Sequence, residues 1–348
     1  MNINRIIKSI PKDYSKHAIR DVSLLTNSIF AETYDSIFKK EFNIEFSSVF
    51  WFIENGLTRF YRSQLEQDNF AKVLGERAMR RKIEHAKNLA KKLIEYTDWF
   101  YGFLEKNKNL EDLIKNKKKF VDNYRIFFAY HQAVYWTGDH ISKLSLTKNK
   151  EKSKKIIKIL DKAYKYNEMV VPDAEKYFKI LKIDKFLYDE IGNDYKFFPE
   201  KQRKKGLGVL FIKSKRTILN WKDSKKLEDY IEKRNKESLM KIKKIKGIVA
   251  QKGNYKGKVY LVKDFRNLKN VKKGIVLVVS QTRPQFNKFI KQAGAIITDE
   301  GGMLCHASML AREFKIPCIV GTRIATKVLK TGNIVEIDSK KGLIRIIE

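Results

Sequence analysis

The chain has 348 residues, of which 43% are hydrophobic and 33% charged, and its formal net charge is +34. This length allows two or three globular domains, and we expect two. The longest apolar runs fall far short of the roughly 20 residues of a membrane helix, and the amino terminus lacks the pattern of a secretory signal. We therefore expect a cytoplasmic protein with no membrane contact.

The positive charge raises the question of an anionic partner such as nucleic acid. The excess is mostly lysine and is spread over both halves of the chain, which also fits a biased genomic composition. Zinc-finger spacing, an RNP-like motif and a segregated arginine-rich arm are missing from the sequence, so a nucleic-acid partner is not favoured. Cys305 and Cys318 form no CxxC pair, and we expect neither a disulfide nor a metal site.

The first part of the chain, residues 1–198, is predicted to be an all-α body. From Ser15 to about Lys185 the pattern is helical, with few glycines and Pro172 as the internal breaker. Amphipathic or aromatic-rich helices are expected over residues 63–74, 86–94, 120–136 and 151–160. The lysines of the last helix favour a solvated face over a binding site.

A change of texture near Pro199 predicts a short second part, residues 199–246. The run at 204–212, a polar turn at 213–216 and the following Thr-Ile-Leu indicate a β-hairpin. A charged helix from about Ser224 to Lys244 would link this hairpin to the next domain.

Residues 247–348 are predicted to form a compact mixed α and β domain, because short β-branched runs alternate with glycine junctions. The expected strands cover 247–251, 258–262, 275–280, 295–298, 318–320, 334–337 and 343–347, and the expected helices 284–292, 306–314 and 322–329. The fold class is thus α+β multidomain, with an all-α body and a small hairpin before this domain.

The segment with the clearest chemistry runs from Thr298 to Thr322. A strand ends, Gly301 and Gly302 turn the chain, and a helix begins at His306. A helix N-terminus offers free N–H groups and a positive dipole to an anion, and paired glycines let the backbone approach a phosphate. A neutral imidazole is also a competent nucleophile. His306 is therefore suited to carry a phosphoryl group.

A bare GGxxxH pattern is a weak signal and by itself favours a helix-capping or core histidine. The other four histidines, His17, His85, His131 and His140, have no supporting motif, and we expect them to be packed or on the surface.

The whole segment GGMLCHASMLAREFKIPCIVGT resembles the phosphohistidine signature of phosphoenolpyruvate synthase, pyruvate phosphate dikinase and rifampin phosphotransferase. The resemblance continues upstream over 247–253, 257–262 and 274–284, and downstream over 328–338 and 342–344. It implies that residues 247–348 form the swivelling β/β/α phosphohistidine domain of phosphoenolpyruvate-utilising enzymes.

On this resemblance His306 is the catalytic phosphoryl acceptor. The residues of its phosphate loop would be Gly301, Gly302, Cys305 and Ala307, and the supporting residues Thr298 and Arg312. Arg312 either pairs with phosphate or braces the fold, and Cys305 is as well explained as a small packing residue. Leu304 stands where kinase-regulated members carry threonine, which puts that regulation in doubt.

Complete enzymes of this kind also hold an ATP-grasp domain and an acceptor site, whereas the first 246 residues contain no GxxxxGK[ST] loop and only isolated glycines before Gly206. We therefore expect that this chain binds no cofactor itself and that ATP and Mg are held by a separate ATP-grasp subunit. The function favoured is a phosphotransferase component that passes a phosphoryl group to a small acceptor such as pyruvate. The alternative is a non-catalytic binding or regulatory protein that retains the swivelling fold.

Overall fold

The computed structural model describes the chain as two compact units. The first comprises residues 1–16, 20–137 and 149–231, and the second 17–19, 138–148 and 232–348. Described residues are 3–20, 22–55, 57–80, 83–144, 149–184, 206–212, 215–239, 242–262, 272–282, 286–303 and 305–347, with the backbone alone described at 17–20, 35 and 236–238. The limits predicted at 198 and 246 stay predictions.

Within the described part of the first unit, five strands form one sheet in the order β1-β3-β2-β4-β5. The strands are β1 (Tyr14–Arg20), β2 (Ser48–Glu54), β3 (Leu57–Ser63), β4 (Leu207–Ile212) and β5 (Lys215–Asn220). The hairpin β4–β5 is confirmed as an antiparallel pair, and β4 also pairs with β2. The prediction of an all-α body over residues 1–198 is wrong, because β1, β2 and β3 lie inside that range.

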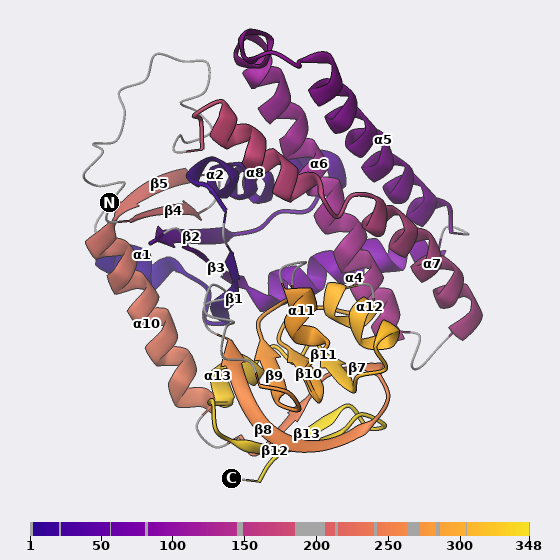
Figure 1. Cartoon of the computed structure of the whole chain (residues 1–348). Coiled ribbons are helices and arrows are strands. Elements are labelled where there is room, and N and C mark those ends of the chain that lie inside the picture. Colours follow the sequence, from indigo (N-terminus) through magenta and orange to yellow (C-terminus); the bar gives the residue numbers. More distant parts are fainter. Residues whose placement is uncertain are drawn as a thin grey trace. The chain divides into compact units, whose positions relative to one another are not determined.

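Helices cover both faces of this sheet (Figure 1). The helices that the structure describes before residue 240 are α1 (Ile3–Ser9), α2 (Leu24–Glu32), the π-helical η1 (Thr33–Ile37), α3 (Phe38–Phe42), α4 (Gln64–Arg80), α5 (Glu84–Lys106), α6 (Leu110–Leu144), α7 (Lys150–Tyr166), α8 (Val170–Ile180) and α10 (Trp221–Leu239). The four helices predicted between residues 63 and 160 are confirmed as α4 to α7. On one face, α1 and α10 bury Ile6 and Leu227 against Phe50 and Phe52.

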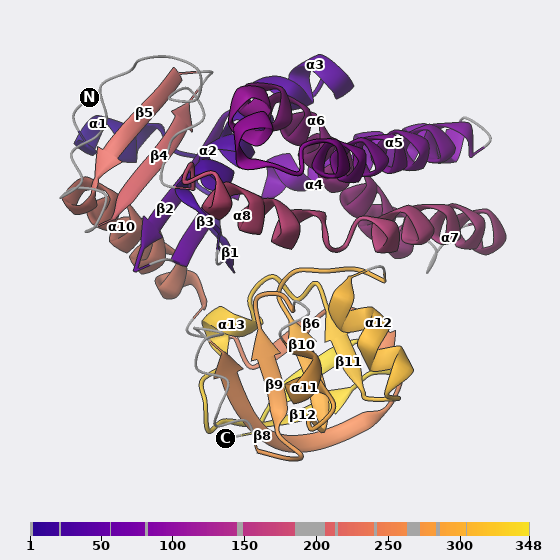
Figure 2. The same cartoon turned by 45° about the horizontal axis from the view of Figure 1, so that its top comes forward.

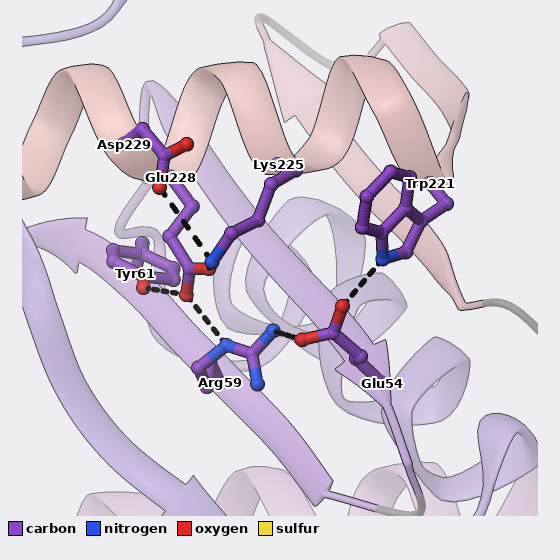
Figure 3. Close-up of polar contacts among 7 residues, drawn as sticks. All are labelled: Glu54, Arg59, Tyr61, Trp221, Lys225, Glu228 and Asp229. Atoms are coloured by element: carbon purple, nitrogen blue, oxygen red, sulfur yellow. Dashed lines mark hydrogen bonds and ion pairs between the residues drawn. The ribbon is translucent and has the colours of Figure 1, made fainter.

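A polar network with Glu228 and Tyr61 at its buried centre joins α10 to the hairpin of β2 and β3 (Figure 3). Arg59 lies between two carboxylates, with its Nε 2.5 Å from Glu228 and an Nη atom 2.7 Å from Glu54. The Tyr61 hydroxyl donates to Glu228 over 2.5 Å, and Lys225 pairs with the same carboxylate at 2.7 Å. Burial alone would raise the pKa of Glu228, but the bonds from Lys225 and Tyr61 and the charge of Arg59 hold it below its usual value.

In the second unit, the described residues form an eight-stranded sheet in the order β6-β13-β12-β8-β9-β10-β11-β7. Strands β8 to β11 are parallel neighbours, while β6, β13, β12 and β8 pair antiparallel (Figure 2). The elements are β6 (Lys244–Lys246), β7 (Ile248–Gln251), β8 (Asn254–Val262), β9 (Val276–Val279), α11 (Asn287–Ile290), β10 (Ala295–Thr298), α12 (His306–Glu313), β11 (Cys318–Val320), α13 (Ala325–Val328), β12 (Ile334–Asp338) and β13 (Leu343–Ile346).

Every strand and helix predicted after residue 247 is present, although several limits differ. Residues 284 and 285 of the first predicted helix lie outside the described residues. The linker helix α10 begins three residues before the predicted Ser224 and ends at Leu239, so that Lys244 belongs to the unpredicted strand β6. Among the described residues, no helix is long and apolar enough to cross a membrane.

Candidate phosphohistidine site

The loop between β10 and α12 shapes the backbone below His306. Gly301 has φ +118°, a conformation that L side chains rarely adopt, and a Cβ added there would lie 2.7 Å from the Sγ of Cys305. The carbonyl of Gly302 then accepts hydrogen bonds from the backbone N–H of Cys305 (3.2 Å) and the hydroxyl of Ser308 (2.6 Å). Cys305 is the extended N-cap residue, so His306 is the first residue of α12.

The imidazole of His306 contacts a side chain from a neighbouring segment. Its Nδ1 lies 2.9 Å from the Oγ1 of Thr282, which follows β9 and is itself buried. Burial lowers the pKa of His306 from 6.5 to about 4, because desolvation penalises the charged ring. The ring is therefore neutral near pH 7 and keeps a nitrogen lone pair.

The other predicted site residues lie in the same segment. The guanidinium of Arg312 donates to the carbonyl of Met303 over 3.0 Å, a contact that braces the loop. The hydroxyl of Thr298 donates to the carbonyl of Glu300 over 2.5 Å. Ala307 is buried on the inner face of α12, and burial raises the pKa of the Cys305 thiol. Leu304 lies outside the described residues.

Two residues that the sequence did not single out also shape this region. Thr282 contacts the ring of His306 directly. Asp299 is buried and accepts a hydrogen bond from the hydroxyl of Thr322 (2.9 Å) and from the backbone N–H of Thr326 (3.2 Å). Asp299 thereby joins the end of β10 to the start of α13. The sequence could have pointed to both residues by their position, because each follows a predicted strand. In the structure these strands are parallel, and functional groups often lie at the carboxyl ends of parallel strands.

Among the described residues, no group of three or more His, Cys, Asp or Glu side chains is arranged so that it could hold a metal ion. The site itself offers one half-buried, neutral imidazole at a helix N-terminus.

Fold and site together define a small domain with a partly parallel sheet that presents one histidine at the start of a helix after a paired-glycine turn. Residues 271–342 match the family described as PEP-utilising enzyme, mobile domain. This region of the chain is such a mobile domain, and the resemblance drawn from the sequence is confirmed.

Relatives of the chain include phosphoenolpyruvate synthases and a phosphotransferase. A probable phosphoenolpyruvate synthase of Archaeoglobus fulgidus is 34% identical over 195 residues, 56% of this chain and 25% of that protein. The phosphoenolpyruvate synthase of Pyrococcus furiosus is 39% identical over 137 residues, 39% of this chain and 16% of that protein. An uncharacterized phosphotransferase of Bacillus subtilis is 40% identical over 101 residues, 29% of this chain and 12% of that protein. The matched segments thus span a quarter of these relatives or less.

Solved structures give weaker likenesses. Aconitase X of Thermococcus kodakaraensis aligns with 30% of this chain and 98% of its own, at 22% identity and a TM-score of 0.25.

Proposed function

We propose that this chain is a phosphotransferase component in which His306 carries a phosphoryl group between a nucleotide site on a separate ATP-grasp subunit and a small acceptor such as pyruvate. The observation that carries the proposal is the ring of His306 at the start of α12, which is half-buried, neutral and hydrogen-bonded through Nδ1 to Thr282. The relatives named phosphoenolpyruvate synthase support the same class of reaction.

In this proposal the Thr282 hydroxyl accepts the Nδ1 proton, so that the lone pair of the neutral ring resides on Nε2. Nε2 then attacks phosphorus, a P–N bond forms, and the bond from phosphorus to the leaving oxygen of the donor breaks with its electron pair. In the second half-reaction an acceptor oxygen attacks phosphorus, and the P–N electron pair returns to Nε2.

The neutral state of His306 favours the first half of this relay, because a neutral ring needs no deprotonation before it attacks. The Thr282 hydroxyl, as acceptor of the Nδ1 proton, then stabilises the positive charge that develops on the ring. The N-terminal end of α12 adds a favourable field for the anionic phosphoryl group.

The experiment is to incubate the purified chain with labelled ATP or phosphoenolpyruvate, with and without cell extract, and to measure acid-labile, base-stable label. We expect label that His306→Gln abolishes and that the matched variant His85→Gln retains. Label that survives His306→Gln would refute the role of this residue. Absence of label under every condition would refute the carrier function and favour the non-catalytic alternative.

A further inference from the structure

The antiparallel half of the second unit has one face in the core and one exposed face. Alternate residues of β6, β13, β12 and β8, such as Ile245, Ile344 and Val335, are buried in the domain core. The residues between them point to the opposite side, because successive side chains of a strand alternate. Register places four of these outward residues in one row across the strands: Lys244, Arg345, Glu336 and Lys256.

This outward face, which we call the basic sheet face, has an excess of positive charge. Its strand cations are Lys244, Lys246, Lys256, Lys258 and Arg345, and all except the half-buried Arg345 are exposed. They lie on the flanking strands β6 and β8, apart from Arg345 on β13. With strands about 4.8 Å apart, the two flanking strands lie roughly 14 Å from each other.

The two central strands carry a different composition. Glu336 and Asp338 on β12 are the acidic outward residues, and they lie 3.4 Å from Arg345 and 4.0 Å from Lys341. Beside them, Leu343 and Ile334 are partly exposed, and residue Ile347 is 46% exposed. The face thus has a centre with partly exposed apolar residues and paired charges, and this centre lies between two cationic edges.

We infer that the basic sheet face docks the acidic surface of another folded protein, with acidic side chains over the cationic edges and apolar contacts at the centre. A nucleic acid suits the face less well. The central carboxylates of Glu336 and Asp338 would face its phosphates, and among the outward positions of the described strands β6, β13, β12 and β8 a single aromatic residue, Tyr260 near the end of β8, could stack on a base. The inference does not rest on the phosphoryl-carrier function, since none of these residues is part of the His306 site.

The test uses two fluorescent probes and the full chain. One probe is a peptide of about 20 residues that alternates glutamate and leucine, a length matched to one side of an ordinary interface. The other is a single-stranded RNA of the same net charge. The face variant is K244E/K256E/K258E. The matched control is K154E/K158E/K162E, which removes the same charge from exposed lysines of α7. Binding is followed by fluorescence anisotropy, and hydrogen exchange maps the bound peptide.

We expect the wild-type chain and the α7 control to bind the peptide alike, the face variant to bind it about tenfold or more weakly, and protection to fall on β6, β13, β12 and β8. Equal weakening in both variants, or protection elsewhere, would overturn the inference. So would RNA that binds more tightly than the peptide and is lost in the face variant. Circular dichroism and His306 labelling should be the same in all three proteins, so loss of labelling in every protein would bear on the carrier function alone.

Discussion

The contact between Thr282 and His306 gives the sharpest test of the proposed chemistry. Thr282→Val keeps the shape of the side chain but removes the hydroxyl 2.9 Å from Nδ1. In the proposed tautomer the Thr282 hydroxyl accepts the Nδ1 proton of His306, and the variant lacks this hydroxyl. The positive charge that develops on the ring during phosphoryl transfer is then no longer stabilised by a hydrogen-bond acceptor. A neutral hydrogen bond contributes about 1 kcal/mol and a charge-assisted bond about 2 kcal/mol, so phosphorylation should slow about 5-fold to 30-fold.

The assay should not depend on an unidentified donor protein. Phosphoramidate transfers a phosphoryl group to imidazole without a second protein, so the rate of label on the peptide that contains His306 can be measured by mass spectrometry. Phosphorus NMR then identifies the nitrogen that is modified. We expect Nε2 in the wild-type chain and a mixture of Nε2 and Nδ1 in Thr282→Val, because valine cannot hold the Nδ1 proton.

The matched control is Thr282→Ser, which retains the hydroxyl and should restore most of the rate. A Thr282→Val variant that folds normally and is labelled at the wild-type rate on Nε2 would refute the reasoning. Equal slowing in Thr282→Val and Thr282→Ser would show that the methyl group, through packing, matters rather than the hydrogen bond.

Three further predictions concern stability. The pKa of His306 is about 4 in the folded chain and about 6.5 in the unfolded chain, so between these pH values the unfolded state binds a proton that the folded state does not. When the pH falls from about 7 to 4.5, the free energy of unfolding of the wild-type chain should therefore drop by about 2 to 3 kcal/mol more than that of His306→Gln. Urea denaturation at the two pH values measures this difference. Gly301→Ala should destabilise the second unit by about 1 to 3 kcal/mol in thermal unfolding and slow labelling, because the added methyl meets Cys305 at φ +118°; unchanged unfolding would contradict the geometry. Glu228→Ala should cost the first unit about 3 kcal/mol, since the mostly buried Arg59 loses the charge of this buried carboxylate, whereas the exposed Asp229→Ala should cost under about 0.5 kcal/mol. Equal losses would show that the network is not the cause.

The sequence predicted the second unit well because its local signals agree with its topology. Each β-branched run there is short and has a glycine close to one of its ends, as at Gly294 and Gly321, so that one limit of each strand is marked. The unpredicted β6 is also followed by a glycine, Gly247, but it is too short to be recognised from its pattern. It has three residues, of which Ile245 alone is buried, and it is held by pairing with β13.

The first unit was mispredicted because β2 does not alternate. Its residues 48–52 are all buried, since helices cover both faces of the sheet, and a continuous apolar run cannot be told from a buried helix by periodicity alone. Two local signals favoured the hairpin. The run is rich in β-branched and aromatic residues, and Asn55-Gly56 follows it, the dipeptide most typical of a two-residue hairpin turn. Asn55 has the positive φ of +52° that such a turn requires.

The start of α10 was also readable in the sequence. The side chain of Asn220 accepts a hydrogen bond from the backbone N–H of Asp223 over 2.9 Å, and its amide donates to the Asp223 carboxylate over 3.0 Å. Asparagine followed three residues later by an acidic residue is a helix-start pattern of the capping-box kind. The buried network between α10 and Arg59 was not readable, because Glu228 and Arg59 are far apart in the sequence and on different elements.

The His306 site shows where local reasoning stops. The paired glycines before His306 and the helical spacing of apolar residues after it predict that His306 is the first residue of a helix. Both patterns lie within one short segment of the sequence. The partner Thr282 lies 24 positions earlier, and it reaches the ring because β9 and β10 are parallel neighbours whose carboxyl ends lie at the same edge of the sheet. Strand order and burial are properties of the whole unit. The sequence could therefore place the nucleophile, whereas its protonation state and the nitrogen that attacks depend on tertiary structure.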